Sequence, residues 1–155
     1  MEPTSLQTAL KQRRPFKSPG HELAVSLLHT ADHVRRQVAA AIAPSGLTVQ
    51  QFNVLRILRG AGDAGLPTLE VADRMVEQTP GITRLLDRLE AKDLVRRQRC
   101  PKDRRQHLCW ITPRGQAMLE QLDEPSLRAS EACVVHLSRG DQATLLRLLE
   151  AIRAT

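Results

Sequence analysis

The stretch LVRRQRCPKDRRQHLCWITPRG, residues Leu94–Gly115, decides the fold of this chain. Its two ends, Leu94–Cys100 and His107–Thr112, are typical of short strands. Between them lies a tight, basic turn made of Pro101, Lys102, Asp103, Arg104 and Arg105. A hairpin of this size buries little surface by itself and needs a neighbouring helix. The stretch therefore predicts a basic β-hairpin that is held away from a helical body, a shape suited to a polyanion.

Positive charge is concentrated around this hairpin. Residues 84–114 contain ten Lys or Arg and four Asp or Glu, a net charge of +6. The whole chain, with 23 basic and 17 acidic residues, is also +6, so the other residues are balanced. A local excess of this kind is expected of a nucleic-acid-binding face. A solvated charged helix and loop is the simpler alternative.

The composition limits the class of protein. A chain of 155 residues fits one domain with a real core. Aromatic residues make up 2%, too few for the stacking platforms of RNA and single-strand binders. No apolar run approaches the roughly 18 residues of a membrane span, and the N-terminus lacks the apolar core of a secretory signal. We therefore expect a cytoplasmic protein without cofactors, whose three cysteines form neither a zinc site nor a disulfide framework.

Helical periodicity governs the rest of the chain. The first predicted helix spans Glu22–Ala43, the second is capped by Thr48 with Gln51, and the third spans Leu69–Met75 and is capped by Thr68. The fourth runs from Thr79-Pro80 to Lys92. The fifth runs from Pro113 to about Val135 with Pro125 as a bend point, and the last is capped by Ser138 with Asp141. The expected fold is mainly α with a small β-hairpin wing. It combines a winged helix-turn-helix over residues 46–112 with a helical dimerisation region over 21–45 and 113–155, after a flexible arm at 1–20.

Three segments resemble the MarR family of bacterial transcription regulators. They are GLTVQQFNVLRIL (Gly46–Leu58), ITRLLDRLEAKDLVRR (Ile82–Arg97) and PKDRRQHLCWITPRG (Pro101–Gly115). The last is similar to the family signature, in which Asp103 and Arg105 form the D-x-R of the wing and Ile111, Thr112 and Gly115 the following L-T-x-x-G. The chain departs from the family at Asp93, where a glycine usually ends the recognition helix. The resemblance implies a homodimer with two winged domains on a pseudo-palindromic operator.

The same resemblance assigns roles in the wing. It makes Arg105 the arginine that enters a minor groove, and Asp103 the carboxylate that orients it, although Asp103 is equally suited to an ordinary turn. The neighbouring cations Lys102 and Arg104 are further candidates for contact with double-stranded DNA. A planar cation suits a narrow, electronegative groove.

The helix predicted to end at Lys92 is the one built to enter a major groove. Its candidate contacts to bases and phosphates are Gln78, Thr79, Thr83, Arg84 and Arg88. Thr79 could instead be only a helix cap. Lys92 is a candidate contact to the DNA backbone, and Thr48 and Gln50 could reach phosphates through free helix N-terminal amides.

The effector and other sites are less defined by the sequence. Members of the family respond to small, often aromatic anions, for which His29, His33 and Arg36 are candidate pocket residues. His29 and His33 lie four residues apart, a spacing that can hold a metal with Asp32 as a third ligand, but we predict no metal site. Cys100, beside Arg99 and Lys102, is the one candidate for a redox-sensing thiol, whereas Cys109 and Cys133 are expected to be buried and inert.

Two other classes of function were weighed. The chain has no G-x-S-x-G, Walker or H-E-x-x-H motif, which argues against an enzyme. A winged helix used only for protein docking would bind no duplex and would show little salt dependence. The basic window around the hairpin favours DNA.

Overall fold

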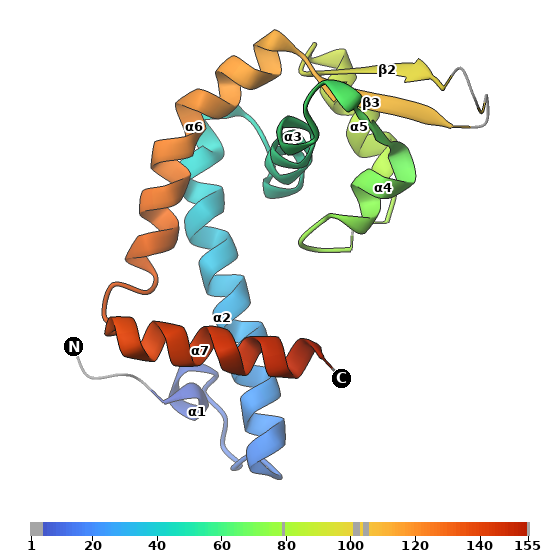
Figure 1. Ribbon diagram of the computed structural model, residues 1–155. Helices are drawn as coiled ribbons and strands as arrows, with labels where there is room; N and C mark the ends of the chain where they lie inside the picture. The colour runs from blue at the N-terminus through green and yellow to red at the C-terminus, as the bar shows by residue number, and fades with distance from the viewer. Residues whose placement is uncertain (1–4, 79, 101–102, 104–105, 155) are drawn as a thin grey trace. The chain divides into compact units, whose positions relative to one another are not determined.

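The computed structural model describes residues 5–78, 80–100, 103 and 106–154 (Figure 1). Its elements are the helices α1 (Leu6–Ala9), α2 (Pro19–Ile42), α3 (Val49–Ala61), α4 (Thr68–Asp73), α5 (Ile82–Ala91), α6 (Pro113–Ala132) and α7 (Arg139–Arg153), the 3-10 turns Ala43–Ser45 and Gly62–Ala64, and the strands β1 (Leu66–Pro67), β2 (Val95–Arg99) and β3 (His107–Ile111). The prediction of a mainly helical fold with a small β wing is confirmed. By internal contacts the chain divides within α2, into residues 1–36 and 37–155.

Helix α2 begins at Pro19, earlier than the predicted Glu22. The Ser18 hydroxyl accepts a hydrogen bond from the amide of His21 at 3.2 Å, and Pro19 occupies the first helical position. A serine cap followed by proline is a common helix start, so the sequence did carry this signal. The arm expected over residues 1–20 contains the short helix α1. The domain boundaries themselves stay predictions.

The start of α3 is as predicted. The Thr48 hydroxyl accepts a hydrogen bond from the amide of Gln51 at 3.2 Å, and the Gln51 side chain accepts one from the amide of Thr48 at 3.1 Å. This reciprocal pair satisfies two amide donors at the helix end. The inner face of α3 forms the centre of one apolar core, whose fully buried side chains include Ile42, Val54, Leu55, Leu58, Val71, Leu86, Leu89, Leu94 and Leu119.

The wing is a three-stranded sheet in the order β1-β3-β2. The predicted hairpin is present, with Val95 opposite Ile111 and Arg99 opposite His107. Leu66 and Pro67 add a short third strand against β3, which the sequence analysis did not identify. Two residues are too few for an alternating pattern to be seen in the sequence.

The prediction that Thr68 caps α4 was also wrong. Thr68 already lies in the first turn of α4, and the cap position falls on Pro67, which has no side-chain hydrogen bond to offer. The Thr68 hydroxyl donates instead to the carbonyl oxygen of His107 at 3.4 Å. It therefore ties α4 to the wing.

Helix α5, which the sequence analysis expects to enter a major groove, starts later than the sequence pattern indicated. It begins at Ile82, so Pro80 is not its first residue. Gly81 takes the cap position with φ +87°, a left-handed conformation that glycine adopts without strain. This break in the backbone separates Gln78 from the helix, and Thr79 lies outside the described residues.

The end of α5 is closed by a residue that is not glycine. Asp93 has φ +58°. Its amide donates to the carbonyl oxygen of Glu90 at 2.9 Å, and the amide of Leu94 donates to that of Leu89 at 3.0 Å. These two bonds form a Schellman motif, in which an aspartate is tolerated but strained relative to glycine. The departure from the family pattern at Asp93 therefore leaves the helix end intact.

Thr112 joins this helix end to the wing and to α6. Its hydroxyl donates to the carbonyl oxygen of Asp93 at 2.7 Å, and its amide donates to that of Leu94 at 3.1 Å. The same hydroxyl accepts from the amide of Gly115 at 3.0 Å and so caps α6. Gly115 must lack a side chain, since a Cβ there would lie 2.3 Å from the carbonyl oxygen of Leu94. We call these four residues, Asp93, Leu94, Thr112 and Gly115, the Thr112 junction.

A Gly115→Ala variant tests this junction. We expect it to lower the free energy of unfolding by about 1–3 kcal/mol, because the backbone of Leu94 or of α6 has to shift. The matched control is Gly140→Ala in α7, where the added Cβ meets nothing closer than 3.8 Å. That control should be neutral or stabilise by up to about 1 kcal/mol. Urea unfolding at equal protein concentration measures both, and equal effects of the two substitutions would contradict the junction.

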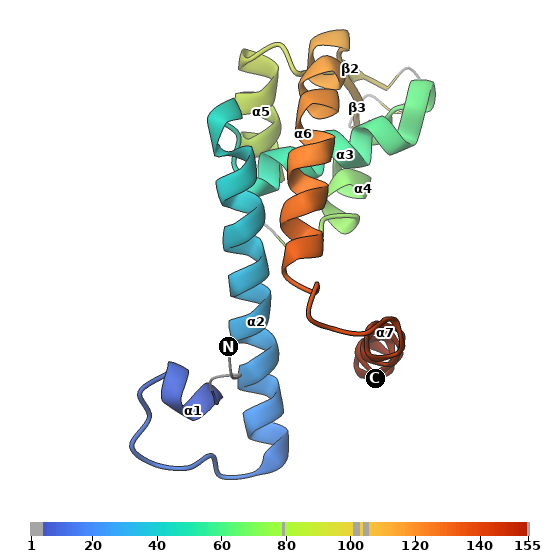
Figure 2. The same cartoon turned by 90° about the vertical axis from the view of Figure 1, so that its left-hand side faces the viewer.

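An ion pair holds α3 against α6, which cross in Figure 2. The Arg59 guanidinium donates to both carboxylate oxygens of Asp123, at 2.7 and 2.9 Å. The hydrogen bonds from Arg59 lower the pKa of the Asp123 carboxyl below its ordinary value. Because this pKa is depressed in the folded chain, the pair stabilises the fold above about pH 4 and loses its effect as pH falls further.

Replacing Asp123 with asparagine tests this pH dependence. Both side chains are more than a third exposed, so we expect Asp123→Asn to cost only about 0.5–1 kcal/mol at pH 7. The difference from wild type should shrink as pH falls from about 4 towards 3, since the carboxylate of the pair is progressively protonated there. Unfolding curves at the two pH values measure this, with Glu131→Gln as a control on the same helix. A difference that persists unchanged at pH 3 would rule out the ionic origin.

Candidate nucleic-acid interface

The outer face of α5 is polar, and three of its side chains make no polar contact with the described part of the chain. Thr83, Arg84 and Arg88 are exposed, whereas Leu86 and Leu89 on the opposite face are fully buried. Within the described part of the chain, the side chains of Thr83, Arg84 and Arg88 form no hydrogen bond or ion pair. The helix therefore presents two cations and a hydroxyl that can all turn toward a ligand.

The other candidates on the helix-turn-helix lie in different settings. Gln78 is exposed but lies in the turn before α5. The side chain of Asn53 on α3 holds this turn in place, because its oxygen accepts a hydrogen bond from the amide of Val76 at 2.9 Å. The ammonium group of Lys92 donates to the carbonyl oxygen of Gly46 at 2.9 Å, so it ties the end of α5 to the corner before α3. DNA contact by these residues stays a prediction.

The expectation of free amides at the start of α3 was wrong for Thr48. Its amide is held by the Gln51 side chain in the capping box, and its hydroxyl is used by the Gln51 amide. Gln50 lies in the first turn of α3 and is half-buried. A phosphate contact through the Thr48 amide would therefore have to break the capping box, whereas the hydroxyl, which only accepts in the cap, can still donate.

Most of the wing tip lies outside the described residues. This applies to Lys102, Arg104 and Arg105, whose roles stay predictions. Asp103 is half-buried, and its carboxylate accepts a hydrogen bond from the Gln106 side chain at 3.1 Å. The amide of Gln106 donates to the carbonyl oxygen of Asp103 at 3.0 Å, and the backbone amide of Cys100 donates to the carbonyl oxygen of Gln106 at 2.9 Å. Asp103 therefore takes part in closing the turn, as an ordinary turn residue does.

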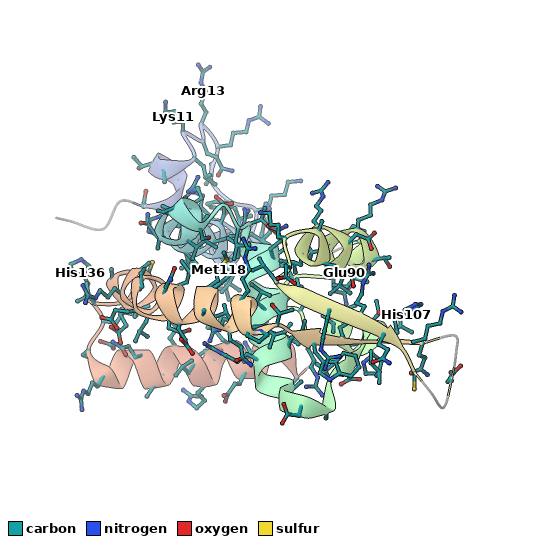
Figure 3. The ribbon with its side chains drawn as sticks, turned by 90° about the horizontal axis from the view of Figure 1, so that it is seen from above. Lys11, Arg13, Glu90, His107, Met118 and His136 are labelled. Carbon is teal, nitrogen blue, oxygen red and sulfur yellow. The ribbon has the colours of Figure 1, made fainter. Side chains whose placement is uncertain are left out.

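Arg97 attaches β2 to the recognition helix. Its guanidinium nitrogens Nε and Nη2 lie 3.0 and 2.5 Å from a carboxylate oxygen of Glu90, and Nη2 also lies 2.5 Å from Asp87. Its backbone amide donates to the other Glu90 oxygen at 3.1 Å. The hydrogen bonds to Glu90, and then to Asp87, raise the pKa of Arg97. Glu90 on α5 can be seen beside the wing in Figure 3.

The opposite face of the wing is held by Trp110. Its indole N–H donates to the carbonyl oxygen of Asp63 at 3.0 Å, and the guanidinium carbon of Arg96 lies 4.1 Å from the ring centroid. Gly65 passes so close that a Cβ there would lie 2.4 Å from the ring. The base of the wing is thus fastened on both faces. Sequence reasoning counted Arg96 and Arg97 only as surface charge and missed both contacts.

The predicted effector residues lie along α2. His29 is half-buried and His33 is exposed. Arg36 is exposed and pairs with Asp32 at 3.2 Å, and Arg35 pairs with the same carboxylate. Among the described residues no three His, Cys, Asp or Glu side chains gather as metal ligands. The role of His29, His33 and Arg36 in an effector pocket is not tested by these contacts.

The cysteines occupy different environments. Cys109 is fully buried, and this burial raises the pKa of its thiol, as expected for an inert side chain. Cys133 is only half-buried, and its thiol donates to the carbonyl oxygen of Ala129 at 3.2 Å. Cys100 is half-buried at the end of β2, and a redox role for it stays a prediction.

Among the residues described, no helix combines the length and the apolar composition needed to cross a bilayer.

Known proteins share this arrangement. Residues 47–107 match the model of the MarR family. The multiple antibiotic resistance protein MarR of Salmonella typhimurium is 32% identical over 112 residues, which are 72% of this chain and 76% of that protein. The transcriptional repressor Rv2887 of Mycobacterium tuberculosis is 30% identical over 120 residues, 77% of this chain and 84% of the repressor. A crystal structure of a variant of E. coli MarR with operator DNA superposes with a TM-score of 0.77 at 27% identity, covering 84% of this chain and 92% of that one.

The attachment of the wing through Arg97 predicts a specific loss of stability. We expect Arg97→Gln to cost about 1–2 kcal/mol, because two carboxylates on α5 lose a shared, largely buried partner. Arg99→Gln is the matched control on the same strand, at an exposed position without an ion pair, and it should change stability by less than about 0.5 kcal/mol. Thermal unfolding without DNA distinguishes the two. Equal behaviour would show that the contact between Arg97 and Glu90 is not structural.

Proposed function

Because the chain belongs to the MarR family of transcription regulators, we propose that it represses transcription as a homodimer on a pseudo-palindromic operator and is released by a small ligand. The chain is a DNA-binding regulator and not an enzyme. The observation that carries the proposal is the outer face of α5, where Thr83, Arg84 and Arg88 are exposed and form no hydrogen bond or ion pair with the residues that the structure describes. A helix of this kind fits a major groove, where arginine pairs with guanine.

The exposed apolar side chains of α6 and α7 support a second copy as partner. Helix α7 has no buried residue, although apolar residues recur at helical spacing along it. Exposed apolar residues in this part of the chain are Leu127, Val135, Leu137, Leu145, Leu146, Leu148 and Ile152. Such a surface is costly in water, and burial against the same surface of another protomer removes the cost. A twofold dimer would also present two copies of α5 to one duplex.

The proposed effector is a small anion, and this part rests on the family resemblance. A surface cavity of about 380 Å³ lies beside the end of α5 and the start of α6. Its lining includes the cations Lys92 and Arg114 and the apolar side chains Leu94 and Met118. Asp93 also lines the cavity, so an anion bound there would meet the two cations beside one carboxylate, next to the Thr112 junction, a place from which it could shift α5.

The proposal is tested by selecting duplexes that the purified protein retains and mapping its protection of them. We expect a protected pseudo-palindrome of roughly 15–20 base pairs, with the two recognition helices about 10 base pairs apart. Affinity should fall steeply with salt, since each displaced counterion adds about −0.9 to the log–log slope. A monomer in sedimentation, or equal affinity for single half-sites, contradicts the dimer. A flat salt response would instead favour protein docking.

Two substitutions on the selected operator separate the helix from the wing. Arg84→Ala should cost about 1–3 kcal/mol of binding and relax base choice at one position. Arg105→Ala should weaken all sequences alike and lower the salt slope by about one. Wild-type affinity of the Arg105 variant at moderate salt would remove the wing from the DNA interface.

A further inference from the structure

The core face of the wing continues beyond the part that the helices cover. Side chains alternate between the two faces of a strand, and the ladder places three cross-strand pairs on one face: Val95 with Ile111, Arg97 with Cys109, and Arg99 with His107. Val95, Ile111 and Cys109 are buried, which identifies this face as the core face. Arg99 and His107 lie on the same face but are exposed. The covered part of the face therefore ends between Arg97 and Arg99.

The exposed pair is available to a ligand. Within the described part of the chain, neither the Arg99 nor the His107 side chain forms a hydrogen bond or an ion pair. Residues directly opposite one another in such a ladder have Cβ atoms about 4.5–5.5 Å apart, so both side chains can reach one group. Guanidinium and imidazole N–H groups donate to oxyanions. The carboxylates of α5 that reach this face, Asp87 and Glu90, are already bound by Arg97.

The pair lies between the attachment to α5 and the wing tip. On one side of it is Arg97, which is bonded to α5. On the other side the ladder ends and the turn begins, where the amide of Cys100 donates to the carbonyl oxygen of Gln106 at 2.9 Å. Two residues of a strand span about 7 Å, so Arg99 lies about that far from Arg97 along β2. In Figure 3, His107 lies further along the wing than Glu90.

Neighbouring grooves of a duplex are separated by one sugar–phosphate strand. If α5 occupies a major groove and the wing tip the next minor groove, that strand has to pass between them, beside the stretch of wing that carries Arg99 and His107. We propose that these two side chains bind a phosphate of that strand and hold the backbone between α5 and the wing tip. A guanidinium group suits the paired oxygens of a phosphate. The inference rests on the proposed function, because it takes α5 and the wing tip to enter neighbouring grooves of one duplex.

The salt dependence of operator binding tests the contact. We expect Arg99→Gln to lower the log–log slope by about 0.9 per protomer, the amount for one lost phosphate contact. Arg99→Lys keeps the charge and should keep the slope. Arg96→Gln, which removes one charge from the opposite face of the same strand, should keep it as well. The order of preference among the selected duplexes should not change, since a phosphate contact carries no base information.

A neutral methylphosphonate, moved along each strand of the operator, tests where the contact lies. Wild type should lose affinity when it replaces the phosphate between the major groove bound by α5 and the next minor groove. Arg99→Gln should lose no further affinity at that position, whereas replacements at other contacted phosphates should weaken both proteins alike. Arg99→Gln combined with His107→Ala should cost less affinity than the two single losses together, because both side chains act on one phosphate.

The outcomes separate this inference from the proposed function. An unchanged salt slope and an unchanged methylphosphonate profile in Arg99→Gln would overturn the inference and leave operator binding through α5 intact. An equal fall of the slope in Arg96→Gln would show a general effect of charge and would also contradict it. If the wild type binds no duplex at all, the proposed function itself fails.

Discussion

The hydrogen bonds of Thr112 are the constraint on which the DNA-binding half of the chain depends. The Thr112 side chain, directly after β3, bonds both the end of α5 and the first turn of α6. Gly115 lets these three backbones approach, since any side chain there would meet the carbonyl oxygen of Leu94. The direction of α5 relative to the wing and to α6 is therefore set by a few short polar contacts next to the apolar core. A small displacement at this junction would be passed to all three elements at once.

The cations of this chain fall into two groups, those that bind groups of the protein itself and those that are available to a ligand. Arg59 and Arg97 bind carboxylates of the protein, and Arg96 lies on the ring of Trp110. These side chains hold elements together and add little to the attraction of a distant phosphate. Arg84, Arg88 and Arg99 are unpaired in the described structure and can exchange water and counterions for a ligand. Net charge alone does not distinguish the groups, because the distinction lies in which carboxylates each cation can reach.

Elements with a repeating pattern could be predicted from the sequence, and single contacts could not. The capping box of α3, the cap at Ser138 and the strands of the hairpin follow from local residue types, and each is present. Errors arose where a local signal had two readings. Pro80 suits a first helical turn but also the turn before Gly81, and Thr68 suits a cap but also a bond across to His107. The contacts of Arg97 and Trp110 join residues on different elements, so they cannot be predicted from the spacing of residues in the sequence.

The residues of α5 that hold the fold together differ from those proposed to contact DNA, and this has a consequence for how the DNA specificity of such a regulator can change in evolution. Its apolar face is buried, and its bonds to the wing pass through Asp87 and Glu90, so the fold places few demands on Thr83, Arg84 and Arg88. If these three positions contact the operator as proposed, substitutions there would change its preferred sequence with little cost in stability, since exposed side chains contribute little to folding. A duplicated gene could therefore acquire a new set of targets by changing one helix face, while the scaffold that presents this face is inherited unchanged.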